Sequence, residues 1–552
     1  MKRFTLVVLV LMLALMVSVV GAQEEKVLRI ISGPDDVPTI DPSHSEDTQS
    51  NDIIEHSFTG LTRLNEVTGE IGPGMATHWE LDGKVYTFHL MDGISWVRFN
   101  PDSGEVEQVL DADGNVRYVT AHDFVYGWQR TLDPELAAYY ASVVGAWVEG
   151  GLEYNSGEGS VDDLAVVALD DMTLQITATN VTAFVPMVYG MWLVNPLPQW
   201  TIDENGDQWT EIGNYHTFGP FTVSEWIHDE SITMVRNPFW PGTDNIPVPD
   251  VDKVISYMLD SSAAMDLYEA DGLDVVAPPL SAMDRVRADP VLSEELVIGT
   301  DLCTYYYGFN VDKEPTNNVH LRRAFSMAID RQSLIDNVTK GGQQPAQWFA
   351  RPGLAAAPTM DTHPDSGIWY DADAAREELA MALEDLGLMS VDELPEITLM
   401  HNTSEGHAAI ATAIQQMWVD ELGIEVQVGN LEWSVFLDLR QNDAPQIFRS
   451  GWCPDYIDVH NFTSDVFRSD SANNDANYNS SEFDALVDAG ATEADLDTRR
   501  DLYAQAEELL VYEDAAIAPI YWYTSVSLTR PNVERTYATI GQERYEKWTL
   551  GD

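Results

Sequence analysis

Basic side chains are scarce in this chain. Its 552 residues include 29 Lys and Arg against 91 Asp and Glu, so the net charge is 29 − 91, or −62. Such a surface repels phosphate backbones and anionic lipid head groups, which excludes nucleic-acid binding and polybasic membrane attachment. Disorder is excluded as well, because 45% of the residues are hydrophobic and 16 Trp, 22 Tyr and 17 Phe supply ample apolar surface for a core.

Cysteine is almost absent, since Cys303 and Cys453 are the two in the chain. This count excludes cysteine-ligated zinc sites and iron–sulfur clusters. In an oxidising compartment one disulfide is the simplest prediction, and two separate buried thiols are the alternative.

Long apolar runs are missing except at the start of the chain. Lys2 and Arg3 precede an apolar run over residues 4–20, and residues 20–22 (VGA) have the small side chains of a cleavage site. Residues 1–22 are therefore predicted to be an export signal, with an uncleaved anchor as the alternative. We expect a mature protein that begins near Gln23, is soluble, and works in the periplasm or another extracytoplasmic space. The cleavage site offers no cysteine for a lipid anchor.

The common catalytic and nucleotide-binding motifs are also absent. The sequence has no GxxxxGK[ST], no GxGxxG, no GxSxG and no HExxH, and its 12 His residues are dispersed without ligand spacing. Among 91 acidic residues, however, a catalytic carboxylate pair is invisible to sequence reasoning, because such a pair is defined by separation in space. A secreted glycoside hydrolase is therefore the rival among enzymes.

The patterns that are present alternate irregularly between helix and strand. They predict an α/β or α+β protein with more than one lobe. Asp111–Asn115 resembles part of a calcium loop, but Val116 and His122 occupy the positions of its Gly and Glu, so a hairpin turn is favoured. The expected strands are 26–31, 85–90, 424–428 and one within 515–523; the expected helices are 52–61, 124–131, 321–340, 374–386, 407–422 and 495–512.

Several segments, in order along the chain, resemble the extracytoplasmic oligopeptide- and dipeptide-binding proteins of ABC importers. The similar segments are 86–96 (YTFHLMDGISW), 120–134 (TAHDFVYGWQRTLDP), 218–221 (FGPF), 237–240 (NPFW), 267–274 (LYEADGLD), 319–331 (VHLRRAFSMAIDR) and 449–456 (RSGWCPDY). The likeness runs from about residue 28 to 535, and it is greatest to the oligopeptide-binding members.

The resemblance implies a two-lobed periplasmic-binding-protein type II fold with an extra third domain that closes about a hinge. Residues 23–66, 191–299 and 515–552 would form lobe I, residues 67–190 the additional domain, and residues 300–514 the other lobe. A peptide would be enclosed by hinge closure and delivered to ABC permease subunits by a monomer, without chemistry and without a cofactor. Within the same fold, a dipeptide, a glycan or a nickel complex is the alternative ligand.

The resemblance also implies a set of peptide-binding residues. Asp455, which follows Gly451 and Trp452, would meet the α-amino group, and Cys453 would pair with Cys303. Arg440, Arg449 and His407 would meet the carboxylate of peptides of different lengths, the two arginines lying on either side of a strand at 445–448. Trp433, Leu437 and Tyr523 would line side-chain pockets, and Glu46 and Thr48 would pair with the peptide main chain.

Three departures from the family pattern leave parts of this expectation open. Pro454 removes a backbone donor next to the amino-terminal site. Residues 97–118 form an insertion, and residues 343–370 match the family poorly.

Overall fold

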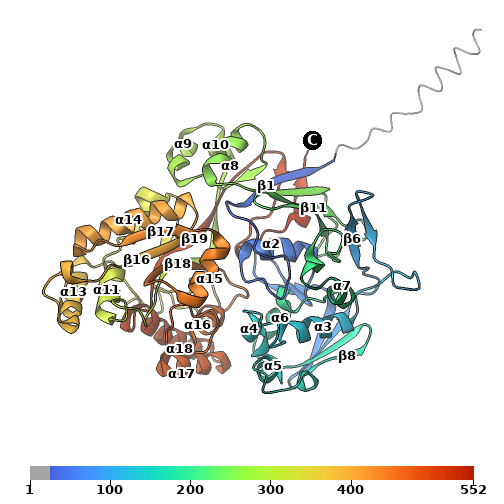
Figure 1. Cartoon of the computed structure of the whole chain (residues 1–552), viewed down its shortest axis with the longest axis horizontal. Coiled ribbons are helices and arrows are strands. Elements are labelled where there is room, and N and C mark those ends of the chain that lie inside the picture. Colours follow the sequence, from blue (N-terminus) through green and yellow to red (C-terminus); the bar gives the residue numbers. More distant parts are fainter. Residues whose placement is uncertain (1–24, 552) are drawn as a thin grey trace, which may run out of the picture.

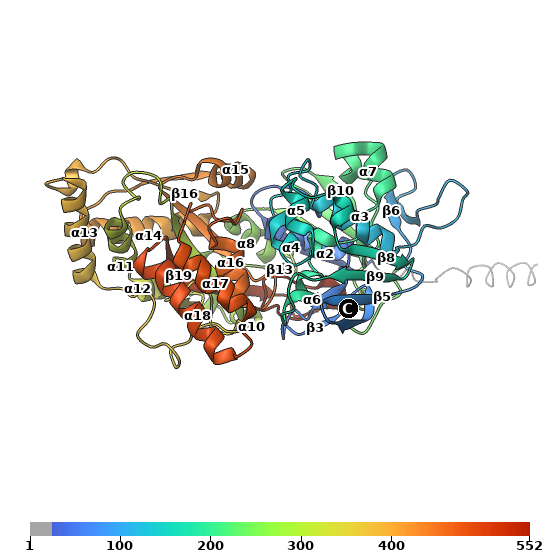
Figure 2. The same ribbon diagram turned by 90° about the horizontal axis from the view of Figure 1, so that it is seen from below.

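The computed structural model describes residues 25–551, so the expected export signal lies outside the described residues. Figures 1 and 2 show two bodies side by side, one mainly blue to green with the red C-terminal segment, and the other mainly yellow to red. Within residues 25–551 we find no helix that is long and apolar enough to cross a membrane.

One body, here called the second lobe, is built around a seven-stranded sheet. Its strand order is β13-β19-β14-β18-β16-β17, with β15 paired to β19. The helix α14 (Glu405–Leu422) connects β16 to its parallel neighbour β17, and α11 (Val319–Met327) packs against α13 (Ala372–Leu386). The strands are β13 (Val275–Val276), β14 (Leu296–Phe309), β15 (Gln344–Pro345), β16 (Thr398–Asn402), β17 (Gln427–Leu431), β18 (Ile447–Trp452) and β19 (Ile517–Thr529).

The other body contains two four-stranded sheets over one continuous core. The first lobe holds the sheet β1-β12-β11-β10, in which β1 and β12 are parallel. The part with the antiparallel sheet β4-β5-β9-β8 and the helix α3 (Ala121–Thr131) is here called the additional domain, and it shares its core with the first lobe. The strands are β1 (Val27–Gly33), β10 (Phe221–Ile227), β11 (Ser231–Arg236), β12 (Lys253–Met258), β4 (Ala76–Asp82), β5 (Val85–Leu90), β8 (Val166–Asp170) and β9 (Thr173–Thr177).

Two long strands, β14 and β19, run between the bodies. Leu296–Thr300 pairs with Leu528–Thr524 beside β13, and the register then shifts before Thr304 pairs with Trp522. The first half of β19 is buried in the core of the second lobe, whereas Leu528 belongs to a small separate core with α8 (Ser261–Glu269). The domain limits expected at 299/300 and 514/515 lie in or next to this pair of strands.

Helix and strand predictions hold where periodicity is strong and fail at the ends of elements. Strand 85–90 is confirmed, but the helix expected at 321–340 ends at Met327 and resumes as α12 (Arg331–Leu334) with a π-helical turn. The strand expected at 424–428 is shifted to 427–431. In the insertion, β6 (Val97–Asn100) and β7 (Glu105–Gln108) form a hairpin, and Asp111 accepts backbone N–H groups in the expected turn.

Candidate functional site

A cavity of about 290 Å³ lies where the first lobe, the additional domain and the second lobe meet. Its lining includes ten of the eleven residues expected to bind peptide; His407 is the exception. The ten are Glu46, Thr48, Trp433, Leu437, Arg440, Arg449, Gly451, Trp452, Asp455 and Tyr523.

At one end of the cavity, Asp455 is a carboxylate without a cationic partner. It follows β18 and precedes α16 (Val459–Phe467), whose Asn461 holds it at two points. The Asn461 amide donates to Asp455 Oδ2 at 2.8 Å, and Asp455 N donates to Asn461 Oδ1 at 3.0 Å. Burial raises the pKa of Asp455 to about 7, with the Asn461 amide lowering it and Asp465 raising it. Within residues 25–551 Asp455 has no salt bridge, so this end of the cavity suits a cation.

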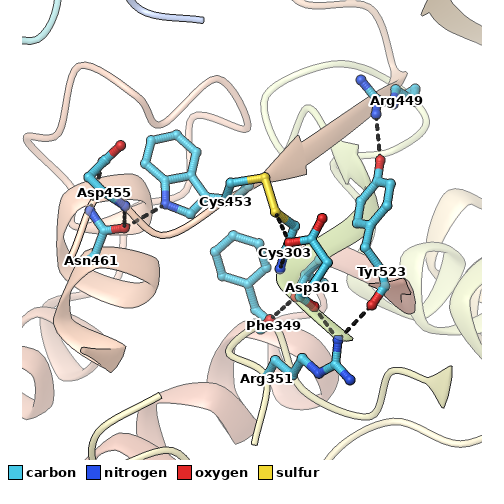
Figure 3. The surroundings of a disulfide bond; sticks show 11 residues. Asp301, Cys303, Phe349, Arg351, Arg449, Cys453, Asp455, Asn461 and Tyr523 are labelled. Carbon is cyan, nitrogen blue, oxygen red and sulfur yellow. Dashed lines mark hydrogen bonds between the residues drawn. A yellow bond between two sulfur atoms is a disulfide. The ribbon is translucent and has the colours of Figure 1, made fainter. Parts of the chain in front are cut away.

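A disulfide fixes the chain on the cavity side of Asp455. Cys303 on β14 is bonded to Cys453 immediately after β18, which confirms the predicted pairing (Figure 3). Gly541 lies against this bond with a φ of +76°, and a Cβ there would come within 3.1 Å of Cys453 Sγ. Only glycine accepts both the left-handed backbone and this close approach. The disulfide therefore links β14 covalently to the residue after β18 at the wall of the cavity, and the C-terminal segment packs against it.

Arg449 is a guanidinium without a carboxylate partner. It lies inside β18, so the expectation that it follows the strand was wrong, because the strand continues to Trp452. Its Nη2 donates to the Tyr523 hydroxyl at 2.7 Å, and its guanidinium carbon lies 4.9 Å from the centre of the Tyr305 ring. No salt bridge to Arg449 occurs in the described part of the chain, which leaves its charge for a ligand.

Arg440, in contrast, is already paired. It lies on α15 (Trp433–Asp443), forms an ion pair with Asp475, and donates to Ser450 Oγ at 3.0 Å. Burial alone would lower the pKa of Arg440, but the Asp475 carboxylate raises it. Tyr139 of the additional domain donates to the same Asp475 at 3.1 Å, so this group also joins the two bodies.

His407 lies behind the cavity rather than in its lining. Its Nδ1 is 3.3 Å from the Tyr305 hydroxyl, and Tyr305 separates it from Arg449 on the same side of the sheet. Burial, followed by the positive charge of Arg449, holds the pKa of His407 well below its usual range. A neutral imidazole in this position offers a ligand carboxylate no charge.

The walls of the cavity combine aromatic and polar groups from both bodies. The Trp452 ring stacks on Tyr140 of the additional domain, with centroids 6.1 Å apart and planes 6° apart. Glu46 of the first lobe accepts a 2.6 Å hydrogen bond from Gln441 on α15. Thr48 begins α2 (Thr48–Ser57), which Asp47 caps by accepting two backbone N–H groups. The cavity is therefore closed by contacts between the lobes.

Several residues that line the cavity were not predicted from the sequence. Tyr140 and Asn51 were not singled out by any motif, Asp47 lies between the expected residues Glu46 and Thr48, and residues 540–542 reach the cavity from the far end of the chain. Asn461 follows Asp455 by six residues. Side chains that meet on a helix are three or four residues apart, so this spacing did not predict their contact. Asp301 is the cavity residue that the sequence could have indicated, because it lies two residues before Cys303, which the resemblance had singled out.

A cavity between two lobes that are linked by a pair of long strands is typical of bilobed ligand-binding proteins. Residues 70–474 match the model of the bacterial extracellular solute-binding proteins, family 5 Middle. The chain belongs to this family.

Relatives in this family are named for different ligands. The oligopeptide-binding protein OppA of Bacillus subtilis is 32% identical over 90% of this chain and 87% of its own length. The dipeptide-binding protein DppE of the same organism is 33% identical over 92% of this chain and 89% of its own. A probable deoxycholate-binding periplasmic protein of Escherichia coli, YgiS, is 29% identical, with 90% and 88% covered.

Solved structures distinguish the arrangement of the lobes. Haemophilus influenzae OppA in complex with the peptide RPPGFSPFR superimposes with a TM-score of 0.84 at 27% identity, covering 96% of this chain and 100% of that one. The E. coli murein tripeptide-binding protein MppA in its unliganded open form gives 0.62 at 28% identity, with 96% and 98% covered. At nearly equal identity, this chain superimposes better on the peptide complex than on the unliganded open form.

Proposed function

We propose that the protein captures oligopeptides outside the cytoplasm and delivers them to the permease of an ABC importer. The observation that carries this proposal is the pair of unpartnered charges at the cavity, the Asp455 carboxylate and the Arg449 guanidinium. A peptide is a zwitterion, so its two termini match these groups, and each buried charge gains a partner on binding.

Each lining group has a role in this proposal. Asp455 binds the α-amino group, and Arg449 binds the carboxylate of short peptides. Arg440 reaches a carboxylate only if the ligand competes with Asp475. The rings of Trp433, Trp452 and Tyr523, with Leu437, enclose side chains, and Glu46 and Thr48 face the main chain beside Gly451.

The mechanism is closure of the lobes about β14 and β19. The register shift between Thr300 and Thr304 supports a hinge there, with lobe I, the additional domain at 67–190 and the second lobe moving as units. The ligand would be bound and released unchanged by an exported monomer that needs no cofactor and performs no catalysis. A volume of about 290 Å³ is small for a ligand cavity and favours peptides of few residues.

The direct test is mass spectrometry of the ligand that co-purifies with the mature protein, followed by calorimetry with peptides of two to six residues. We expect short peptides in the spectrum and loss of affinity when either terminus is blocked by acetylation or amidation. Blocked and free peptides of equal affinity would contradict the proposal, as would a bile acid, a glycan or a nickel complex as the retained ligand.

Two variants separate the arginines within this test. Arg449→Ala and Arg440→Ala should damage binding of different peptide lengths, since one guanidinium is unpaired and the other is held by Asp475. If neither substitution alters affinity for any length from two to six residues, the carboxylate assignment is wrong.

A further inference from the structure

Asp301 is a second acidic group in the cavity that the proposed capture of peptide termini does not use. It lies on β14 two residues before Cys303 and contributes to the cavity lining. Figure 3 shows its carboxylate directed toward the disulfide and away from the guanidinium of Arg351. Arg351 instead donates to the main-chain oxygens of Asp301 and Tyr523.

The carboxylate of Asp301 has one donor and no ion pair. Cys303 N donates to Oδ1 at 3.3 Å, a long hydrogen bond, and Asp301 has no salt bridge to any residue that the structure describes. Among the described residues no hydrogen bond reaches the second carboxylate oxygen, and Asp301 contributes to the lining of the cavity. Burial raises the pKa of Asp301 to about 7, against the lowering effects of the Cys303 amide and of Arg351.

The charges around the cavity do not balance without a cationic ligand. Its lining has four acids, Glu46, Asp47, Asp301 and Asp455, against Arg440 and Arg449. Asp47 caps α2 and Glu46 accepts from Gln441, while Arg440 is neutralised by Asp475, which is not in the lining. After a peptide has paired its amino group with Asp455 and its carboxylate with Arg449, three lining acids remain without an ion pair among the described residues. Of these, Asp301 has only the long hydrogen bond from Cys303 N and lies beside the disulfide.

We propose that Asp301 determines specificity by binding a cationic side chain, that of a lysine or arginine, near the amino end of the peptide. The position follows from the disulfide, which lies between Asp301 and the turn that carries Asp455 (Figure 3). A charged side chain that enters a partly desolvated cavity gains little unless it finds an opposite charge there, and Asp301 supplies one. This inference rests on the proposed peptide ligand.

The test compares peptides that differ in one charge. Tetrapeptides of alanine carry lysine, or lysine acetylated on its ε-amino group, at the first, second or third position; acetylation keeps the stem and removes the charge. Calorimetry at pH 7.5 on the mature protein, freed of ligand by unfolding and refolding, should give a preference of about tenfold or more for lysine at one of these positions.

Asp301→Asn should bring that ratio close to one, while the ratio survives in the control Glu46→Gln. Because the affinities of the lysine and acetyl-lysine peptides are compared within one variant, general damage to the cavity affects both and leaves their ratio unchanged. The Asn side chain keeps an oxygen that can accept from the Cys303 amide. Equal binding of both peptides by the unaltered protein would overturn the inference, as would a preference that persists in Asp301→Asn or vanishes in Glu46→Gln. If no peptide of two to six residues binds at all, the proposed function itself fails, which is a distinct result.

Discussion

Asp455 and Arg440 lie in the lining of the same cavity and both bury a charge, but their surroundings differ. Asp455 is held by the neutral amide of Asn461, and among residues 25–551 it forms no ion pair with a cation. Arg440 has the carboxylate of Asp475, which also receives the hydroxyl of Tyr139 from the additional domain. In the proposed function the first charge binds the ligand, whereas the second forms an ion pair within the protein. Residue type alone therefore does not identify a ligand-binding group; the pairing of its charge does.

The largest expected effect comes from breaking the paired charge. Asp475→Ala leaves the guanidinium of Arg440 buried without its partner, which should lower the free energy of unfolding by about 3 kcal/mol. Thermal unfolding measures this as a lower Tm. The control is Asp443→Ala, which breaks the exposed pair to Lys313, where the Asp443 side chain is 75% exposed. Equal changes in Tm for both variants would show that burial of the Arg440 pair is irrelevant.

Removing the unpaired charge should affect binding instead of stability. Asp455→Asn should weaken peptide binding by at least about tenfold, because the ligand's ammonium loses its buried counter-ion. The Tm should not fall, since an unpartnered buried carboxylate does not stabilise the free protein. Calorimetry checks the affinity, with Asp438→Asn as the matched control on the exposed side of α15. Unaltered affinity would refute the assignment of Asp455.

Protonation of Asp455 at low pH removes the same charge as Asp455→Asn. It should therefore weaken peptide binding by no more than that substitution does. The pKa of Asp455 is about 7 in the free protein. A bound ammonium should lower it, so affinity is fully present above pH 7 and is lost as the pH falls. For a peptide without ionisable side chains, we expect at least about tenfold weaker binding at pH 5 than at pH 7.5. A pH profile that is the same in Asp455→Asn would assign the titration to another group.

The smallest effect should come from the contact that links the paired charge to the other body. Tyr139→Phe removes one hydroxyl hydrogen bond to Asp475, worth about 1 kcal/mol. We expect peptide to dissociate roughly fivefold faster, as measured by stopped-flow competition. Tyr118→Phe, on an exposed ring of the insertion, is the control and should dissociate at the original rate. A slower rate in Tyr139→Phe would mean that this bond opposes closure.

The sequence predicted the class of fold and the surroundings of Cys453 because local patterns carry both. Strand 85–90 alternates strictly, and the segment around Cys453 resembles a family motif over consecutive residues. The partners that set the electrostatics were not predictable. Asp475 lies 35 residues from Arg440, Asn461 was placed by the start of a helix, and Tyr140 comes from another domain. Nothing in a local pattern reports which charge is neutralised by a residue distant in the chain.

Element ends were missed for a related reason. The long amphipathic pattern at 321–340 predicted one helix, yet tertiary packing ends α11 at Met327 and begins a second helix after Asp330, which caps it. The limit of β18 was misplaced because pairing with β14 extends the strand to Trp452. That extension brings the Arg449 side chain into the sheet beside Tyr305.

The contacts that close the bodies around the cavity include single hydrogen bonds, from Gln441 to Glu46 and from Tyr139 to Asp475. Each such hydrogen bond contributes only about 1 kcal/mol, and the ring of Phe184 adds a stacking contact with Tyr456 at a centroid distance of 4.9 Å. A ligand between the lobes adds its own contacts to these and so lengthens the lifetime of the closed state. An empty protein would reopen quickly and sample new solutes, and a loaded one would persist long enough to meet its membrane partner.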